Sequence, residues 1–226
     1  MQNANQMKQL PTIIFATLLL AACTVNKYPE SMEGESIAKT KHISVPFSSQ
    51  SPFADWDDPR QQEGCEEMSL IMVHHFLEEA DLNKEQALNE LMELSAWEKD
   101  HGYPLDVDIN ELAAIAEEYY GYDATVSKDV SVDAIKQLVA NGNPIILPAS
   151  GRDLGNPYFS GEGPWYHMLV VTGYDRNEFI TNDPGTKRGK YYKYRYETLL
   201  NAIHDWTGIK ENIRSGRKAL LILRKN

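Results

Sequence analysis

The stretch Gln62-Glu63-Gly64-Cys65-Glu66-Glu67-Met68-Ser69 marks the point at which a loop gives way to a helical pattern. Cys65 follows a glycine and precedes the first apolar residues of that pattern. A thiol in the first turn of a helix faces backbone N–H groups without intrahelical partners and the positive end of the helix dipole, and both favour the thiolate. The position therefore suits a nucleophilic cysteine.

The composition predicts one globular domain. The chain has 226 residues, 42% of them hydrophobic, which is enough to build a core without disulfides. Its formal net charge of −11 argues against nucleic acid as a partner, because phosphate binding needs basic patches. We expect a monomer.

The N-terminus has the pattern of an export signal. Lys8 precedes an apolar run at 12–22 that is too short to span a bilayer. The run ends in Leu20-Ala21-Ala22-Cys23, which resembles the lipobox of bacterial lipoproteins. That resemblance implies that 1–22 is removed and that Cys23 carries a lipid anchoring the protein to the cell membrane, outside the cytoplasm. The alternatives are an ordinary secretory signal, or a disulfide between Cys23 and Cys65.

The rest of the chain divides into a tether and a domain. Residues 23–41 are polar and without periodicity, as expected of a flexible tether, and 42–226 form the domain. Hydrophobic periodicity predicts helices at 66–80, 83–94, 109–120, 131–140 and 196–205. Strands are predicted at 43–47, 144–147, 168–174, 178–182, 190–194 and 219–223. Helices followed by strands indicate an α+β fold, with an N-terminal helical half and a C-terminal antiparallel sheet.

A cysteine nucleophile needs a base within hydrogen-bond reach, and His167 is the best-placed histidine. His74 and His75 lie on the cysteine's own helix, about 14 Å away at 1.5 Å per residue. The remaining three are expected to have no catalytic role: His42 follows the tether and is partly ordered, His101 is solvated in a turn, and His204 lies on the surface of the C-terminal helix. His167 stands where a Gly/Pro-rich loop meets an apolar strand, although an ordinary histidine at a strand start explains the position equally well.

A predicted hairpin brings Asp183 to this histidine. If 175–177 form a three-residue turn, Tyr174 pairs with Glu178, and period-two alternation puts His167 and Asp183 on one face as diagonal neighbours. A register error of one residue would separate them. The alternative for Asn182-Asp183-Pro184-Gly185 is a plain turn.

Four segments in this order resemble the C-39-like family of papain-fold cysteine peptidases. They are Val45-Pro46-Phe47-Ser48-Ser49-Gln50, then Gly64-Cys65-Glu66, then Tyr166-His167-Met168-Leu169-Val170-Val171-Thr172-Gly173-Tyr174-Asp175, and last Asn182-Asp183-Pro184. The resemblance implies a papain-like fold, with Cys65 as nucleophile, His167 as base and Asp183 as the group that orients it. It also implies Gln50 as an oxyanion donor beside the Cys65 N–H, a peptide or protein as substrate, and no cofactor. Because 51–63 is longer than the family pattern, Gln62 is the second choice for that donor.

Acidic residues surround the thiol and oppose its ionisation. Glu63, Glu66 and Glu67 would raise the pKa of Cys65, so an imidazolium at His167 would have to offset them. They could instead bind a basic substrate group or complement the helix N-terminus, and we favour the last explanation.

The sequence does not predict a metal-binding site. A weak calcium-loop pattern at 106–117 has Glu111 where the sharp turn needs glycine, and Asp108 with Glu111 fits a capping box better. No His/Cys/carboxylate spacing suggests zinc. Besides a Cys-His-Asp thiol hydrolase, two hypotheses remain: a cell-wall peptide amidase or transpeptidase on the same fold, and a non-catalytic binding lipoprotein.

Overall fold

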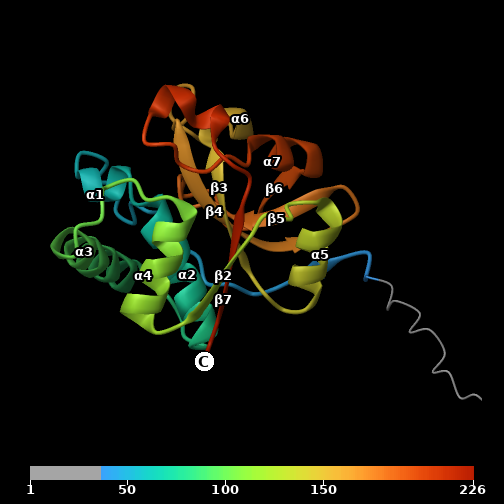
Figure 1. Cartoon of the computed structure of the whole chain (residues 1–226), viewed down its shortest axis with the longest axis horizontal. Helices are drawn as coiled ribbons and strands as arrows, with labels where there is room; N and C mark the ends of the chain where they lie inside the picture. The colour runs from blue at the N-terminus through green and yellow to red at the C-terminus, as the bar shows by residue number, and fades with distance from the viewer. Residues whose placement is uncertain (1–36) are drawn as a thin grey trace, which may run out of the picture. The chain divides into compact units, whose positions relative to one another are not determined.

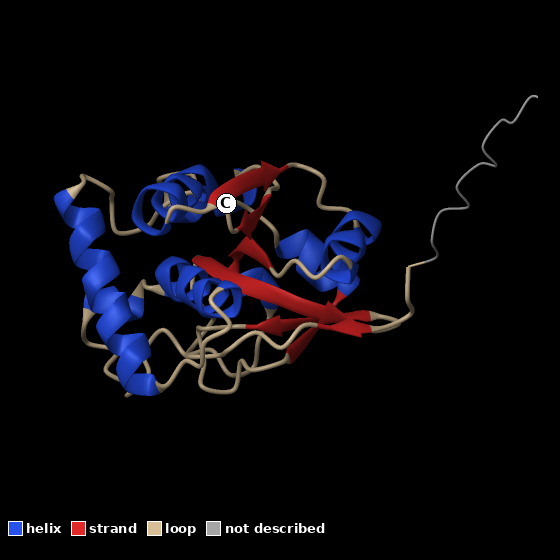
Figure 2. Ribbon diagram, turned by 90° about the horizontal axis from the view of Figure 1, so that it is seen from below, coloured by secondary structure: helices blue, strands red, loops and turns tan. Residues whose placement is uncertain are grey.

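An antiparallel sheet forms the centre of the computed structural model, which describes residues 37–226. Seven strands lie within the described residues, in the order β2-β7-β3-β4-β5-β6, with β1 paired to β4. The strands are β1 (Lys41–His42), β2 (Asp123–Ser127), β3 (Ile145–Ser150), β4 (Tyr166–Tyr174), β5 (Glu178–Asn182), β6 (Tyr192–Arg195) and β7 (Leu220–Arg224). Figure 2 shows them crossing the middle of the domain between helices. The predicted α+β class is correct.

The helices form two groups around this sheet. They are α1 (Pro59–Gln62), α2 (Cys65–Leu77), α3 (Lys84–Asp100), α4 (Ile109–Tyr120), α5 (Val132–Ala140), α6 (Gly151–Leu154), α7 (Tyr196–Ala202) and the 3₁₀ helix η1 (Lys210–Ser215). In Figure 1, α1 to α4 gather to the left of the sheet and α5 lies to its right. None of the helices in residues 37–226 is both long enough and apolar enough to cross a membrane.

The helix α2 is the buried centre of the helical group. It packs against β4, α3 and α4, and every residue from Cys65 to Val73 is buried. The prediction of a single apolar stripe therefore understated its burial, because α2 is enclosed on all sides over its first turns. Two carboxyl groups, Glu66 and Glu67, enter the core with it.

A β-bulge changes the strand register within the β4–β5 hairpin. Tyr174 pairs with Phe179, not with Glu178 as predicted, because Asp175 accepts the N–H groups of Asn177 and Glu178 and lengthens the turn. The register then shifts between Val171 and Gly173. Beyond this bulge Val170 pairs with Asn182, which is the register that the three-residue turn predicted.

Three other predictions about elements need correction. The strand expected at 43–47 is absent because the N–H of Val45 turns back to the carbonyl of Ile43. Lys41, expected to end the tether, instead pairs with Tyr174 in β1. The C-terminal helix ends at Ala202 rather than at 205. The predicted signal peptide 1–22, Cys23 and the tether up to residue 36 lie outside the described residues.

Candidate active site

Cys65 is the first residue of α2, which begins one residue before the predicted helix at 66–80 and ends at Leu77. Gly64 precedes it at the junction with α1, where a Cβ would lie 2.2 Å from the carbonyl oxygen of Arg60. Only glycine allows the two helices to meet this closely, so Gly64 sets the position of the thiol. The side chain of Cys65 is buried, and its Sγ accepts the Met168 N–H at 3.2 Å.

The thiol has a carboxyl group as its nearest polar neighbour. Cys65 Sγ lies 2.9 Å from Oε2 of Glu66, to which the S–H donates. Burial raises the pKa of the Cys65 thiol well above its ordinary value, and the charge of Glu66 acts in the same direction. The N–H of Met168 opposes this shift but does not cancel it. Of the three acids predicted to surround the thiol, Glu66 is therefore the one in contact, while Glu63 pairs with Lys210.

His167 and Asp183 are hydrogen-bonded to each other in the core. Nε2 of His167 lies 2.8 Å from Oδ1 of Asp183, and both side chains are buried. His167 is the second residue of β4 and Asp183 follows the last residue of β5. Their predicted proximity is found, because the bulge keeps them on one face of the hairpin. The contact through Nε2 leaves Nδ1 of His167 for another partner.

Two residues that sequence analysis missed complete the surroundings of Asp183. Its Oδ2 accepts hydrogen bonds from Tyr194 Oη at 2.5 Å and from Asn156 Nδ2 at 3.0 Å. Burial by itself raises the pKa of Asp183, but the charge of His167 and these hydrogen bonds outweigh it and leave the pKa below its usual value. Tyr194 belongs to an alternating tyrosine strand and Asn156 to a Gly-Asn-Pro turn, so neither carried a sequence signal for this role.

The Asn182-Asp183-Pro184-Gly185 segment is more than a plain turn. The N–H of Gly185 donates to Asp183 Oδ1, and a Cβ on Gly185 would lie 2.8 Å from Cε1 of His167. Glycine is therefore required for the imidazole to occupy its place. The carbonyl of Pro184 accepts the N–H of Gln50, which joins this turn to the Val-Pro-Phe segment.

A cavity of about 820 Å³ connects these elements. Cys65 and His167 both line it, together with Gln50 and Gln62. The aromatic residues among its lining are Phe53, Trp56, Tyr158, Phe159, Trp165 and Tyr166. Such a cavity can hold an extended peptide with apolar side chains beside the thiol.

Gln50 is not free to act as the predicted oxyanion donor in this structure. Its Nε2 donates to the carbonyl oxygens of Gln61, at 3.1 Å, and Gln62, at 2.7 Å. Carbonyl oxygens only accept, so these contacts assign the amide nitrogen and occupy both of its hydrogens. The side chain of Gln62, the second choice, is exposed and lines the same cavity.

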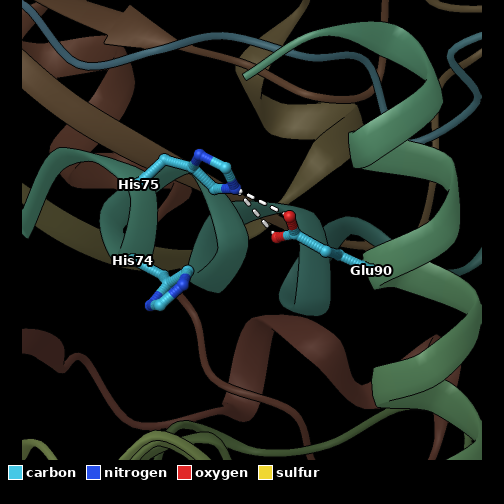
Figure 3. Close-up of side chains that lie close together, drawn as sticks. All are labelled: His74, His75 and Glu90. Atoms are coloured by element: carbon cyan, nitrogen blue, oxygen red, sulfur yellow. Dashed lines mark hydrogen bonds and ion pairs between the residues drawn. The ribbon is translucent and has the colours of Figure 1, made fainter. Parts of the chain in front are cut away.

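The remaining described histidines lie in other surroundings. His74, His75 and Glu90 come close together between α2 and α3, where His75 Nε2 is 2.9 Å from both oxygens of Glu90 (Figure 3). His75 Nδ1 contacts the carbonyl of Asp81, so an ion pair and a backbone contact account for both ring nitrogens. His204 lies beyond the end of α7, where its Nδ1 contacts the carbonyl of Gly216, and not inside a helix as predicted.

Two buried carboxyl groups, one from α2 and one from α3, influence each other. Glu67 and Glu98 are both buried, and each shifts the pKa of the other. Burial raises the pKa of Glu67 to about 7, and burial together with the charge of Glu67 raises that of Glu98 to about 11. Because two carboxylates in contact repel, the pair must hold at least one proton in the folded protein.

We expect this pair to make the folded protein less stable as the pH rises. The folded pKa of Glu67 is above its unfolded value of about 4.3, so the native state binds more protons and stability is greatest below that value. Stability should fall as the pH rises through 7, by at most about 4 kcal/mol from Glu67. Urea unfolding at several values between pH 5 and 8 measures this loss, which Glu67→Gln should reduce and the exposed Glu93→Gln should not. Parallel curves for wild type and Glu67→Gln would contradict the expectation.

Comparison with known proteins identifies the family. Residues 42–212 match the sequence model described as the Peptidase_C39 like family. The chain therefore belongs to this family, which places it among the cysteine-peptidase-like hydrolases. Comparison with curated protein sequences gave no match.

A solved structure supports the fold. The crystal structure of a protein described as a C39-like peptidase from Bacillus anthracis aligns with a TM-score of 0.55 at 18% sequence identity. The alignment covers 84% of this chain and 100% of that chain. At this identity the likeness shows the fold alone, and the fold is the papain-like α+β fold that the sequence predicted.

Proposed function

We propose that this protein is a thiol hydrolase that cleaves peptide or amide bonds with Cys65, His167 and Asp183. The observation that carries the proposal is that Cys65 and His167 line one cavity, while His167 is hydrogen-bonded to Asp183 on the side away from its free nitrogen. A nucleophile, a base and a group that orients the base are the minimum set for acyl transfer.

Each residue has one task in this proposal. The Cys65 thiol gives its proton to Nδ1 of His167, and the thiolate attacks the substrate carbonyl. The oxyanion is held by the N–H of Cys65 and a side-chain amide, for which we choose Gln62 because the amide of Gln50 is already bonded to two carbonyl groups. His167 then protonates the leaving amine, with its ring held by Asp183, and water releases the acyl group.

The location of the enzyme is a separate proposal. We propose that Cys23 carries a lipid that anchors the domain to the outer side of the cell membrane. The support is the lipobox-like sequence Leu20-Ala21-Ala22-Cys23 and the start of the family match at residue 42. The intervening 19 residues, 23–41, would act as the tether.

One observation favours the alternative of a non-catalytic binding lipoprotein. The thiol is buried and its pKa is raised, which is the opposite of what a resting thiolate needs. The proposal therefore requires that His167, once protonated, lowers the pKa of Cys65 through its positive charge.

The pH dependence of thiol alkylation tests the proposed function. In the full-length chain carrying Cys23→Ser, Cys65 is the sole thiol. Iodoacetamide should label it well below pH 8.5, the ordinary midpoint of a free thiol, and His167→Ala should slow labelling at pH 7 by about tenfold or more. His101→Ala, which removes an exposed imidazole elsewhere, is the control. Labelling that follows an ordinary thiol and does not respond to His167→Ala would contradict the proposal.

A further inference from the structure

The carboxyl of Glu66 touches the reacting atom and is sealed from solvent. Its Oε2 lies 2.9 Å from Cys65 Sγ, and its Oε1 accepts the N–H of Val107 at 3.3 Å. The residue is 0% exposed. It follows the nucleophile directly, so the two side chains leave α2 from adjacent positions of its first turn.

Among the described residues, no positive group forms an ion pair with this carboxyl. The titratable groups that face it are Glu67 and Cys65 from α2, Glu98 from α3, Asp106 from the segment before α4, and Tyr166 from β4. Burial raises the pKa of Glu66 well above its usual value, and the charges of Glu67 and Asp106 add to the effect. A buried carboxyl with acidic neighbours and no cation holds its proton at neutral pH.

A protonated carboxyl has an O–H group to donate, which a carboxylate lacks. We propose that Glu66 is a neutral acid that donates a hydrogen bond to the Cys65 thiolate during the reaction. The thiol proton passes to His167, and the proton of Glu66 stays on its own oxygen, so no further proton acceptor is needed. The thiolate then has two donors, the N–H of Met168 and the O–H of Glu66.

This inference rests on the proposed function and removes its main difficulty. A charged Glu66 would oppose the thiolate that the mechanism requires, whereas a neutral Glu66 stabilises it. The resting contact, in which the S–H donates to Glu66, and the reactive contact, in which Glu66 donates to the sulfur, use the same pair of atoms.

Two substitutions at Glu66 distinguish a donor from an anion. Glu66→Gln keeps a hydrogen-bond donor and can never be charged, whereas Glu66→Met keeps the length and helix preference of the side chain without a donor. The readout is the midpoint of iodoacetamide labelling against pH in the full-length chain carrying Cys23→Ser. We expect Glu66→Gln to stay within about half a pH unit of wild type, and Glu66→Met to move the midpoint upward by about one unit, which is about tenfold slower labelling at pH 7.

The controls separate this inference from the proposed function. Glu93→Gln removes an exposed acid of α3 that contacts neither Sγ nor Glu66, and its midpoint should remain near that of wild type. Equal shifts in Glu66→Gln and Glu66→Met, no shift in Glu66→Met, or labelling tenfold faster in Glu66→Gln would each overturn the inference. A midpoint that does not depend on His167 overturns the proposed function instead.

A spectroscopic measurement keeps the test independent of how the Glu66→Met protein folds. The infrared difference spectrum of wild type minus Glu66→Gln at pH 7 should contain a carboxylic-acid C=O band from Glu66. A carboxylate band in its place would overturn the inference.

Discussion

Replacing Cys65 with serine should reduce peptide hydrolysis by about 10⁴-fold or more without unfolding the protein. Loss of the nucleophile is among the largest single effects on catalysis, because a hydroxyl at this position would have to lose its proton against a far higher pKa. Serine is close to cysteine in shape, so it can keep the contacts of the side chain with Met168 and Glu66. The measurement is the appearance of new amino termini from fluorescein-labelled casein and from a muropeptide digest.

Ser69 provides a matched control for this experiment. It lies one turn further along α2, is fully buried, and its hydroxyl has no hydrogen-bond partner among the described residues. Ser69→Ala should therefore keep both fold and hydrolysis. Activity that survives in Cys65→Ser would show that another group carries the reaction. Cleavage of the muropeptides alone would favour the cell-wall amidase over a general peptidase.

Replacing Asp183 with alanine should have the largest combined effect on stability and activity. The substitution leaves four donors without their acceptor in the core, namely the His167 ring, the Tyr194 hydroxyl, the Asn156 amide and the Gly185 N–H. Removing one partner from a buried charged pair costs about 3–5 kcal/mol. Hydrolysis by the fraction that remains folded should fall by about 10²-fold or more, because nothing then orients the imidazole. Urea unfolding and the hydrolysis assay at low denaturant measure the two effects.

Tyr194→Phe separates the charge of Asp183 from its structural contacts. The variant removes one of the hydrogen bonds to Asp183 and leaves the His167 contact in place. We expect it to cost about 1–2 kcal/mol of unfolding free energy and to affect hydrolysis much less than Asp183→Ala does. If Asp183→Ala unfolds no more easily than Tyr194→Phe, the carboxylate is not the central acceptor of this network.

Local sequence patterns predicted those helices and strands whose ends are set by residues within or next to the element. The helix at 109–120 has the predicted bounds because Asp108 and Glu111 form a capping box and Gly121 ends it in a left-handed conformation. The strand at 178–182 also has its predicted bounds. By contrast, β2 was missed because Asp123–Ser127 is a short edge strand whose apolar face consists of Ala124 and Val126 alone. Two alternating apolar residues give a weak periodic signal, and pairing with the distant strand β7 forms the element.

The sequence by itself determined the helix start at Cys65 and the hairpin that carries His167 and Asp183. Both depend on residues close together in the chain, whose turn and helix preferences act locally. Tertiary structure decided which groups touch these side chains. Met168 reaches the sulfur across 103 positions, and Tyr194 and Asn156 reach Asp183 from separate segments. It also selected Glu66 among three neighbouring acids, because only packing against β4 and α4 determines which carboxyl is buried beside the thiol. Burial shifts the pKa of a group and thereby its charge at neutral pH, and burial is a property of the folded chain.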